Sequence, residues 1–441
     1  MNLTEKFHKM EAEFELFDIG KDEDNQLWDI LRYHVFIRYL YPQTGLQRLS
    51  SDHKRKRRSI IRLIKEAFKI FFKFINPLDK SESIILTTSR SVNSNGKYYD
   101  KAGSSIIEIL KNKIIVLEAL ASKKCEYNTY YDFSFFYRRL YKSKFINLKD
   151  YKKIEVAINS EFGQNNFTLK EANKVYHNFQ ADNHFYTTVF KLKNLKSIFI
   201  CLGNPKAQIK AAKANDMESF LVQHGVYDFD EIHISYPERI NSESNVLFCD
   251  KVLTYGTYWG KGINIPTKEI LSIGNNFYNT KLQLDQDNTI IVVSTIIHGE
   301  ELKYLTKKIA RTNLNQKFVF KLHPNEYQFK DDYLKFFRHT NNVIVVTNEE
   351  DIQVLISKAQ LIVLIASTVI YEALHLCKKV AVYKKLNYYK HLNLIDIPNV
   401  YFFEEELEIN QILGNETIEH EISFYDKLDE KLVLSFVNNN N

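Results

Sequence analysis

The sequence predicts an α/β protein in which short buried strands alternate with helices and form parallel sheets. Three polar motifs indicate this fold, because each follows a run of apolar, often β-branched residues: QHG at 223–225, KLHPNE at 321–326 and ASTVIYEAL at 366–374. A buried parallel strand has this pattern when a polar loop follows its carboxyl end. Ligands of open α/β sheets bind at that edge. We therefore expect the three loops to converge on one site for a phosphorylated small molecule.

Strands and helices alternate in two halves of the chain. In the first half we expect a helix at 205–214 and strands at 83–87, 113–117, 196–201, 219–222, 251–254 and 269–273. In the second half we expect helices at 299–310 and 369–376 and strands at 289–294, 318–322, 342–347, 361–365 and 379–383. This alternation predicts two Rossmann-like domains, at 81–280 and 281–441, after a helical segment at 1–80.

Composition places the chain among ordinary globular proteins. Its 441 residues are enough for two domains, with 44% apolar and 26% charged residues. The four cysteines are far apart and have no metal-ligand spacing, which favours a reducing compartment and no metal site. The amino-terminal residues mix acids and bases, unlike a secretory signal, and no run reaches the roughly 20 apolar residues that cross a bilayer. We expect a protein that is cytoplasmic or sits on the cytoplasmic face of a membrane.

A basic amphipathic helix is predicted at 54–74. This stretch holds nine Lys or Arg residues and one acid in a chain of net charge +6, so the remainder is slightly acidic. Apolar residues such as Ile64 and Phe71 share one face, while Arg62, Lys65, Lys69 and Lys73 share the other. Such a helix suits an anionic membrane surface, although a helix packed on a core with a solvated basic face has the same pattern. No nucleic-acid motif is present.

The first motif places His224 between Gln223 and Gly225, just past a buried strand. A histidine in this position can act as a general base near neutral pH, and Gly225 permits a close turn. A loop histidine without a catalytic role is the equal alternative. We expect Gln223 and Gly225 to line an acceptor pocket. Tyr236, in the aromatic and polar segment that follows, and Tyr255, after the next strand, are expected to line the same pocket.

The other two motifs suit phosphate. Pro324 restricts His323, whose imidazole can donate a hydrogen bond to a phosphate; Glu326 is either a ribose contact or a solvent-facing acid. Ser367 and Thr368 precede a helix, where unpaired N–H groups attract anions and where either hydroxyl can instead cap the helix. Glu372 lies one turn further on. A P-loop, GxGxxG, GxSxG and HExxH are absent from the sequence, and we identify no obvious DxD metal motif, which removes the main support for kinases, dehydrogenases, serine hydrolases and metalloproteases.

The order of these motifs resembles that of bacterial capsule and surface-polysaccharide glycosyltransferases of GT-B fold. The similarity covers QHG, SYP at 235–237, LTYGTYW at 253–259, IGN at 273–275, KLHP and S-T-x-x-x-E-A-L. It extends more loosely to CDP-glycerol glycerophosphotransferases and to sialyl- and Kdo-type transferases. The chain lacks the longer Trp-His-Gly-Thr-Pro signature of the glycerophosphotransferases and the acidic motif of the sialyltransferases.

The resemblance implies two Rossmann-like halves that face each other across a cleft. It implies a nucleotide-sugar donor that is CMP-, CDP- or UDP-linked, with cytidine favoured. The donor would be held by His323, Ser367, Thr368 and Glu372. A polysaccharide or lipid-linked glycan acceptor would bind near His224. No cofactor or metal is expected. A polyol-phosphate transferase and a non-catalytic scaffold of a capsule assembly complex remain alternatives.

Overall fold

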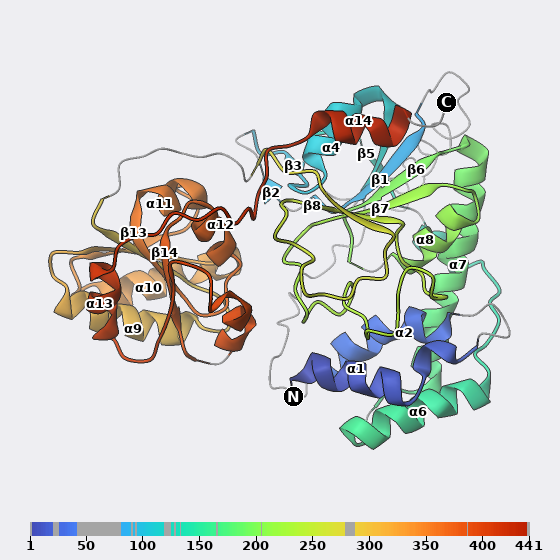
Figure 1. Cartoon of the computed structure of the whole chain (residues 1–441), viewed down its shortest axis with the longest axis horizontal. Helices are drawn as coiled ribbons and strands as arrows, with labels where there is room; N and C mark the ends of the chain where they lie inside the picture. The colour runs from blue at the N-terminus through green and yellow to red at the C-terminus, as the bar shows by residue number, and fades with distance from the viewer. Residues whose placement is uncertain are drawn as a thin grey trace. The chain divides into compact units, whose positions relative to one another are not determined.

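The structure is a computed structural model that describes residues 2–20, 26–41, 81–89, 91–92, 95–118, 125–127, 129–132, 134–164, 166–203, 205–277, 287–385 and 387–438 (Figure 1). The chain divides into two compact units. The first comprises Met1–Tyr255, Trp259–Asn275 and Lys427–Asn441, and the second comprises Gly256–Tyr258 and Asn276–Asp426. The predicted basic helix at 54–74 lies outside the described residues.

The first unit contains a parallel sheet of seven strands in the order β5-β4-β1-β6-β7-β8-β9. Its strands are β1 (Ser83–Thr87), β4 (Ile114–Glu118), β5 (Thr129–Tyr131), β6 (Ser197–Ile200), β7 (Glu218–Val222), β8 (Lys251–Thr254) and β9 (Glu269–Ser272). Every residue of β1, β4 and β6 is buried, as the β-branched runs predicted. Two short strands, β2 (Ser91–Val92) and β3 (Tyr98–Tyr99), form a separate antiparallel pair.

Helices of the first unit pack around this sheet and also form a layer of their own. They are α1 (Leu3–Glu13), α2 (Leu27–Val35), α4 (Ser104–Leu110), α5 (Ser134–Tyr137), α6 (Leu148–Phe162), α7 (Leu169–Lys193), α8 (Lys206–Lys213) and α14 (Glu430–Asn438), with short turns η1 (Leu16–Asp18), η3 (Phe36–Leu40) and η5 (Lys111–Lys113). A capping box of Asn2 and Glu5 begins α1. Thr168 caps α7, which ends at Asn194 in a left-handed conformation.

The second unit contains a parallel sheet of six strands in the order β12-β11-β10-β13-β14-β15. The strands are β10 (Thr289–Val293), β11 (Lys317–Lys321), β12 (Val343–Val346), β13 (Ala359–Leu364), β14 (Lys379–Tyr383) and β15 (Val400–Phe403). Between them run α9 (Gly299–Thr312), η6 (Pro324–Phe329), α10 (Lys330–Phe337), α11 (Ile352–Lys358), α12 (Val369–His375), η7 (Tyr388–Leu394) and α13 (Glu408–Gly414). Ile290, Phe318, Leu361 and Ala381 of the four central strands are fully buried in one core.

Both sheets have the same order when their strands are numbered within the unit. The first strand is central, the second and third lie to one side, and the fourth onward lie to the other. This is the Rossmann order, and the place where it reverses is where such sheets bind ligands. The reversal lies between β1 and β6 in the first unit and between β10 and β13 in the second. The predicted α/β fold with two Rossmann-like units, the composition of the GT-B class, is confirmed.

The compact units differ from the predicted segments at both ends of the chain. The described helices within 1–80 belong to the first unit and are no segment of their own. Helix α14, which we had placed in the carboxyl-terminal domain, also belongs to the first unit. The physical reason is apolar packing, since the ring of Phe436 lies 4.7 Å from that of Phe220 in β7. Within the described part of the chain, no helix is long and apolar enough to cross a membrane.

Candidate functional site

The three polar motifs lie where the sequence placed them, at the carboxyl ends of strands. Gln223 and His224 follow β7 in the first unit. In the second unit, His323 follows β11, and Ser367 and Thr368 connect β13 to α12. The structure thus places one motif on the ligand-binding edge of the first sheet and two on that of the second.

His224 is exposed at the end of β7. Its Nδ1 lies 3.4 Å from the carbonyl oxygen of Val222, and its ring centre lies 5.5 Å from that of His233. A carbonyl oxygen can only accept a hydrogen bond, so this contact favours the tautomer with the ring proton on Nδ1 and the lone pair on Nε2. Nε2 faces Gly203, where an added Cβ would lie 4.0 Å away. This tautomer is the one a general base needs.

Gln223 has a structural position rather than the pocket-lining one that we predicted. Its side chain is fully buried, its Nε2 donates to the carbonyl of Gly225 (2.9 Å), and its Oε1 accepts from the Tyr255 N–H (2.8 Å). Tyr255 is itself 5% exposed, whereas Gly225 is exposed. Gln223 therefore joins the His224 turn to the end of the neighbouring strand β8, and Tyr255 is part of the interior.

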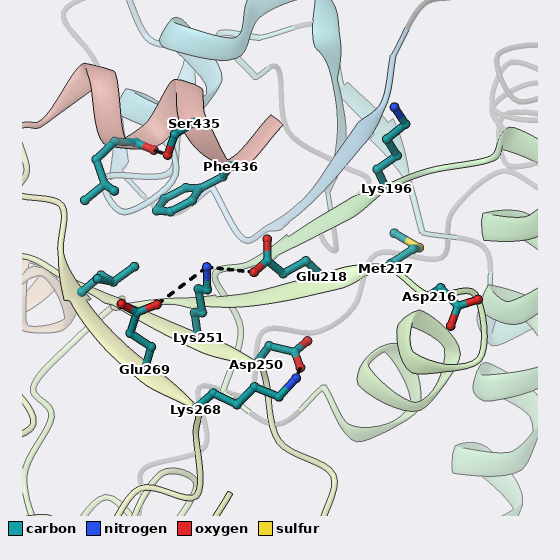
Figure 2. A pocket seen from close by; sticks show the side chains of 12 residues that line it. Lys196, Asp216, Met217, Glu218, Asp250, Lys251, Lys268, Glu269, Ser435 and Phe436 are labelled. Carbon is teal, nitrogen blue, oxygen red and sulfur yellow. Dashed lines mark hydrogen bonds and ion pairs between the residues drawn. The ribbon is translucent and has the colours of Figure 1, made fainter. Parts of the chain in front are cut away.

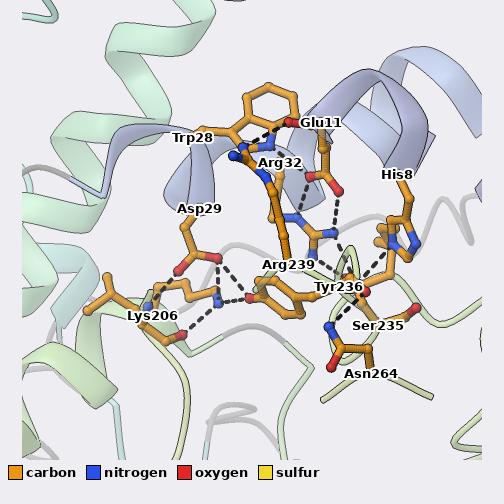
Figure 3. A network of polar contacts seen from close by, with 12 residues as sticks. His8, Glu11, Trp28, Asp29, Arg32, Lys206, Ser235, Tyr236, Arg239 and Asn264 are labelled. Carbon is orange, nitrogen blue, oxygen red and sulfur yellow. Dashed lines mark hydrogen bonds and ion pairs between the residues drawn. The ribbon is translucent and has the colours of Figure 1, made fainter. Parts of the chain in front are cut away.

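Tyr236 was also predicted to line a pocket, but it lies in a buried polar network (Figure 3). Its side chain is 1% exposed; its hydroxyl donates to Asp29 (2.8 Å) and lies 2.5 Å from the Lys206 ammonium. Asp29 pairs with Lys206 at 2.9 Å and accepts the Leu247 N–H at 2.7 Å. A tyrosine whose hydroxyl is held by two buried charges is part of the core.

The second part of this network joins α1 and α2 to the loop after His224. Arg32 donates to both carboxylate oxygens of Glu11 (2.7 and 2.9 Å), and both side chains are at most 1% exposed. Burial opposes the charge of Arg32, but Glu11 outweighs it and holds the Arg32 pKa above its ordinary value. Arg32 also donates to the carbonyls of Ile232 (2.6 Å) and Ser235 (3.1 Å). The amino-terminal helices therefore fix the loop that follows the candidate base.

Sequence patterns did not identify this network, although they contained a signal for it. Glu11 in α1 and Arg32 in α2 each come directly after a buried apolar residue, Met10 and Leu31 respectively. A charge at a core position of an amphipathic helix has to be paired when it is buried. The partners on the loop, however, are about 200 residues away in sequence, and no local pattern identifies them.

His323 begins η6 and is oriented by its own turn. Its Nδ1 accepts the Asn325 N–H (3.2 Å), so the ring proton of the neutral form is on Nε2. Burial lowers the pKa of His323 below its ordinary value, and Glu326 only partly opposes this. The ring is therefore neutral at pH 7, with Nε2–H as a hydrogen-bond donor at the sheet edge.

Glu326 is neither a ribose contact nor a solvent-facing acid. It is 3% exposed and accepts hydrogen bonds from the His323 N–H (3.0 Å), the Ser294 hydroxyl (3.0 Å) and the Tyr333 hydroxyl (2.8 Å). A Cβ on Gly299 would lie 2.4 Å from both Glu326 Oε1 and the Tyr333 oxygen. The carboxylate therefore connects the end of β10, η6 and α10 beneath the edge, and a side chain at 299 would displace its hydrogen bond with Tyr333.

Ser367 and Thr368 lie at the start of α12. Ser367 is half-buried and its hydroxyl accepts the Val369 N–H at 3.4 Å, whereas Thr368 is exposed and its side chain makes no capping bond. Glu372 is half-buried in the first turn. At the reversal between β10 and β13, the structure adds His298, 2% exposed, whose Nε2 lies 3.3 Å from the Asn387 amide nitrogen. The sequence analysis missed both residues.

One buried histidine of the second unit predicts a pH dependence. His391 is 5% exposed, and burial, aided by Lys390, lowers its pKa to about 4, against 6.5 unfolded. Between these values the unfolded chain binds the proton more readily, so stability is retained above pH 6.5 and falls as pH falls toward 4. We expect the second unit to lose about 2 kcal/mol from pH 7 to pH 5 through this group.

Urea unfolding of the wild type and of His391→Leu at both pH values measures this loss. The substituted protein should lack that part of the pH dependence, whereas His339→Leu, at an exposed position of the same unit, should keep it. Equal pH dependence in wild type and His391→Leu would contradict the assignment.

A cavity of about 710 Å³ lies in the first unit, at the amino ends of the strands (Figure 2). The charges that line it are largely paired with each other: Lys251 lies 2.9 Å from Glu218 and 3.7 Å from Glu269, and Lys268 lies 2.7 Å from Asp250. This is the sheet edge opposite His224, and it contains none of the predicted site residues. Among the described residues, no group of three or more His, Cys, Asp or Glu side chains is placed to hold a metal.

The fold and the motifs at its sheet edges define an α/β protein of two Rossmann-like units with a histidine on each ligand-binding edge. No protein-family model matches the chain, and no curated protein matches its sequence. Solved structures do match it. UDP-GlcNAc 2-epimerase from Neisseria meningitidis, bound to UDP-GlcNAc, is 13% identical with a TM-score of 0.48 and covers 81% of this chain and 100% of its own.

Two further solved structures also match the chain. The lipopolysaccharide outer core galactosyltransferase WaaB is 10% identical, with a TM-score of 0.43 over 81% of this chain and 95% of its own. MurG from Acinetobacter baumannii is 10% identical, with a TM-score of 0.42 over 75% and 89%. Such identities and TM-scores are too low to indicate a shared activity.

Proposed function

We propose that the protein is a glycosyltransferase that moves a sugar from a nucleotide-activated donor to a surface polysaccharide or lipid-linked glycan. One observation supports this most. The contacts of the two histidines on the ligand-binding edges favour opposite tautomers, with the lone pair of His224 on Nε2 and the proton of His323 on Nε2. One ring can accept a proton and the other can donate a hydrogen bond, which are the two requirements of transfer from a phosphate leaving group.

In the proposed reaction, Nε2 of His224 takes the proton of the acceptor hydroxyl as its oxygen attacks the anomeric carbon of the donor. The bond between that carbon and the phosphate oxygen breaks, and the nucleotide leaves with the bonding electrons. Nε2–H of His323 and the hydroxyls of Ser367 and Thr368 would stabilise the negative charge on the phosphate. We further propose that Glu372 contacts the ribose and that these groups act without a metal ion.

Nucleotide binding tests the proposal. We expect CMP or CDP to raise the melting temperature of the full chain more than UDP, and GDP and ADP to have no effect. A ligand at one hundred times its Kd stabilises the folded state by roughly 2.7 kcal/mol. His323→Ala should lose most of the shift, while His339→Ala, an exposed histidine of the same unit, should keep it. A shift with purine nucleotides alone would contradict the cytidine assignment.

The same assay separates the alternatives. A scaffold without catalytic function should show no shift with any nucleotide. A polyol-phosphate transferase should bind CDP-glycerol and release CMP, whereas a sugar transferase should release nucleotide only from a nucleotide sugar. We also propose that the protein works at the inner face of the cell membrane through the basic residues at 54–74.

A further inference from the structure

The connection between α5 and α6 is held along one face of α7. Residues 173, 177 and 180 are three and four apart, so they share a helical face, and each binds the connection through polar atoms. Asn173 accepts the Ile146 N–H (2.8 Å), His177 contacts the Arg138 carbonyl and the Ser143 hydroxyl (2.8 Å each), and Gln180 bonds both the N–H (3.0 Å) and the carbonyl (3.2 Å) of Lys144. The backbone of the connection is therefore fixed.

Apolar side chains project from this fixed backbone into solvent. Leu140 is 82% exposed and Phe145 is 81% exposed, more than any other large apolar side chain among the described residues. On α6, Leu148 (58%) and Val156 (57%) lie two turns apart on one face. The hydrogen bonds to α7 hold the backbone in the arrangement that exposes Leu140 and Phe145, so a loose loop does not account for their exposure. Large apolar side chains that are exposed close together in sequence, on a backbone held by hydrogen bonds, are typical of an interaction site.

Basic residues alternate with these apolar residues along the sequence. Residues 138–153 contain seven Lys or Arg and one acid, Asp150. Arg138 is paired with Asp182 and Lys152 with Glu155. The other five are exposed and form no ion pair with any residue in the described part of the chain: Arg139, Lys142, Lys144, Lys149 and Lys153. We call these residues, with Leu140, Phe145, Leu148 and Val156, the loop–α6 surface.

We propose that the loop–α6 surface docks onto an anionic lipid bilayer. Leu140 and Phe145 would enter the boundary between headgroups and acyl chains, while the lysines would contact lipid phosphates. A second copy of the chain is a poor partner because two strongly positive surfaces repel each other. Nucleic acid would match the charge, but it offers no apolar environment for exposed Leu140, Leu148 and Val156. This proposal does not depend on the proposed transferase activity.

The surface lies near the point where the chain enters residues 42–80. The ring of Tyr39 lies 5.3 Å from that of Phe167, and its hydroxyl bonds Glu171, so the end of η3 contacts the connection between α6 and α7 and the first turn of α7. The basic stretch at 54–74 begins thirteen residues after Tyr41. Stable membrane binding commonly needs two signals, and the loop–α6 surface would supply one that is separate from residues 54–74.

Vesicle binding by the full chain tests the charge requirement. The variant Lys142→Glu, Lys144→Glu, Lys149→Glu, Lys153→Glu should bind phosphatidylglycerol-containing vesicles more weakly by on the order of 10²–10³-fold, at roughly fivefold for each basic residue. The control Arg311→Glu, Lys317→Glu, Lys335→Glu, Arg338→Glu changes the net charge equally at exposed positions of the second unit, and it should bind within about fivefold of wild type. Equal weakening of both variants overturns the proposal.

Insertion is tested at a single residue. The two native tryptophans, Trp28 and Trp259, are at most 4% exposed, so Phe145→Trp adds a separate exposed reporter. Its emission should shift to shorter wavelength with anionic vesicles and not with phosphatidylcholine alone. Leu140→Ala with Phe145→Ala should weaken binding, whereas Leu314→Ala with Leu407→Ala, at positions 75% and 68% exposed, should not.

Three further outcomes overturn the proposal. The first is an unshifted emission of Phe145→Trp. The second is a wild-type oligomer that dissociates in the Leu140→Ala, Phe145→Ala variant, which would assign the surface to a second copy. The third is binding to single-stranded DNA that is tighter than binding to anionic vesicles and is lost in the lysine variant, which would assign the surface to nucleic acid.

Discussion

Replacing Arg32 with methionine is expected to lower the unfolding free energy of the first unit by about 3–5 kcal/mol, because it leaves one partner of a buried ion pair without the other. Glu11 is fully buried and accepts both of its Arg32 hydrogen bonds at 2.7 and 2.9 Å. The Ile232 and Ser235 carbonyls would lose a donor as well. Urea unfolding of the full chain should show the shift in the transition of the first unit and not in that of the second.

A second substitution separates the unpaired charge from the loss of packing. Glu11→Met in the Arg32→Met background should recover most of the stability, because an apolar pair of similar volume can replace a buried ion pair at little cost. Arg239→Met is the control: Arg239 lies 3.6 Å from Asp18 in a partly exposed pair, which is worth at most about 1 kcal/mol. If Arg32→Met lowers the unfolding free energy by less than about 1 kcal/mol, the Glu11 carboxylate is either uncharged or able to reach water.

His224→Ala is expected to reduce transfer by about 10²–10⁴-fold, the usual effect of removing a general base. Nucleotide affinity should change little, because His224 is on the sheet of the first unit and the proposed donor contacts are on that of the second. His323→Ala should instead weaken nucleotide binding by about 1.5–3 kcal/mol, the range for hydrogen bonds to charged groups. Single-turnover transfer and nucleotide titration on the same preparations measure both quantities.

The matched control is His339→Ala, which removes an exposed imidazole elsewhere and should leave both quantities unchanged. Wild-type turnover by His224→Ala, with donor and acceptor saturating, would return His224 to the role of an ordinary loop residue. A loss of nucleotide affinity in His224→Ala would instead place the donor on the first unit, and would require a different assignment for His323.

Strands were more predictable from sequence than helices were. Buried parallel strands such as 83–87 and 289–293 are runs of β-branched residues, and this pattern depends only on burial at both faces. Helix α7 was not predicted, although it is 25 residues long. Polar residues interrupt its apolar pattern, and His177 and Gln180 among them bond the connection to α6. Their partners lie more than 30 residues away, so local periodicity does not show them.

The same distinction applies to the candidate site. Positions of His224 and His323 followed from the strands before them, because parallel strands bring their carboxyl ends to one edge. The environments of Gln223 and Tyr236 did not follow, since each polar side chain finds its partner by tertiary contact. Tyr236 bonds Asp29 across 207 residues. A polar residue after a strand therefore predicts a place in the fold but not whether the side chain faces solvent or the core.

The return of α14 to the first unit has a consequence for the order of folding during synthesis. Residues 276–426, nearly all of the second unit, emerge from the ribosome before Lys427–Asn441. Until then Phe220 and Phe199 lack Phe436, whose ring lies 4.7 and 6.5 Å from theirs. The nascent first unit thus keeps an apolar patch uncovered while the second unit is made, and such surfaces are where chaperones bind and aggregation begins. A ribosome-stalled chain ending at residue 426 should retain that exposed patch, and release of the full chain should close it.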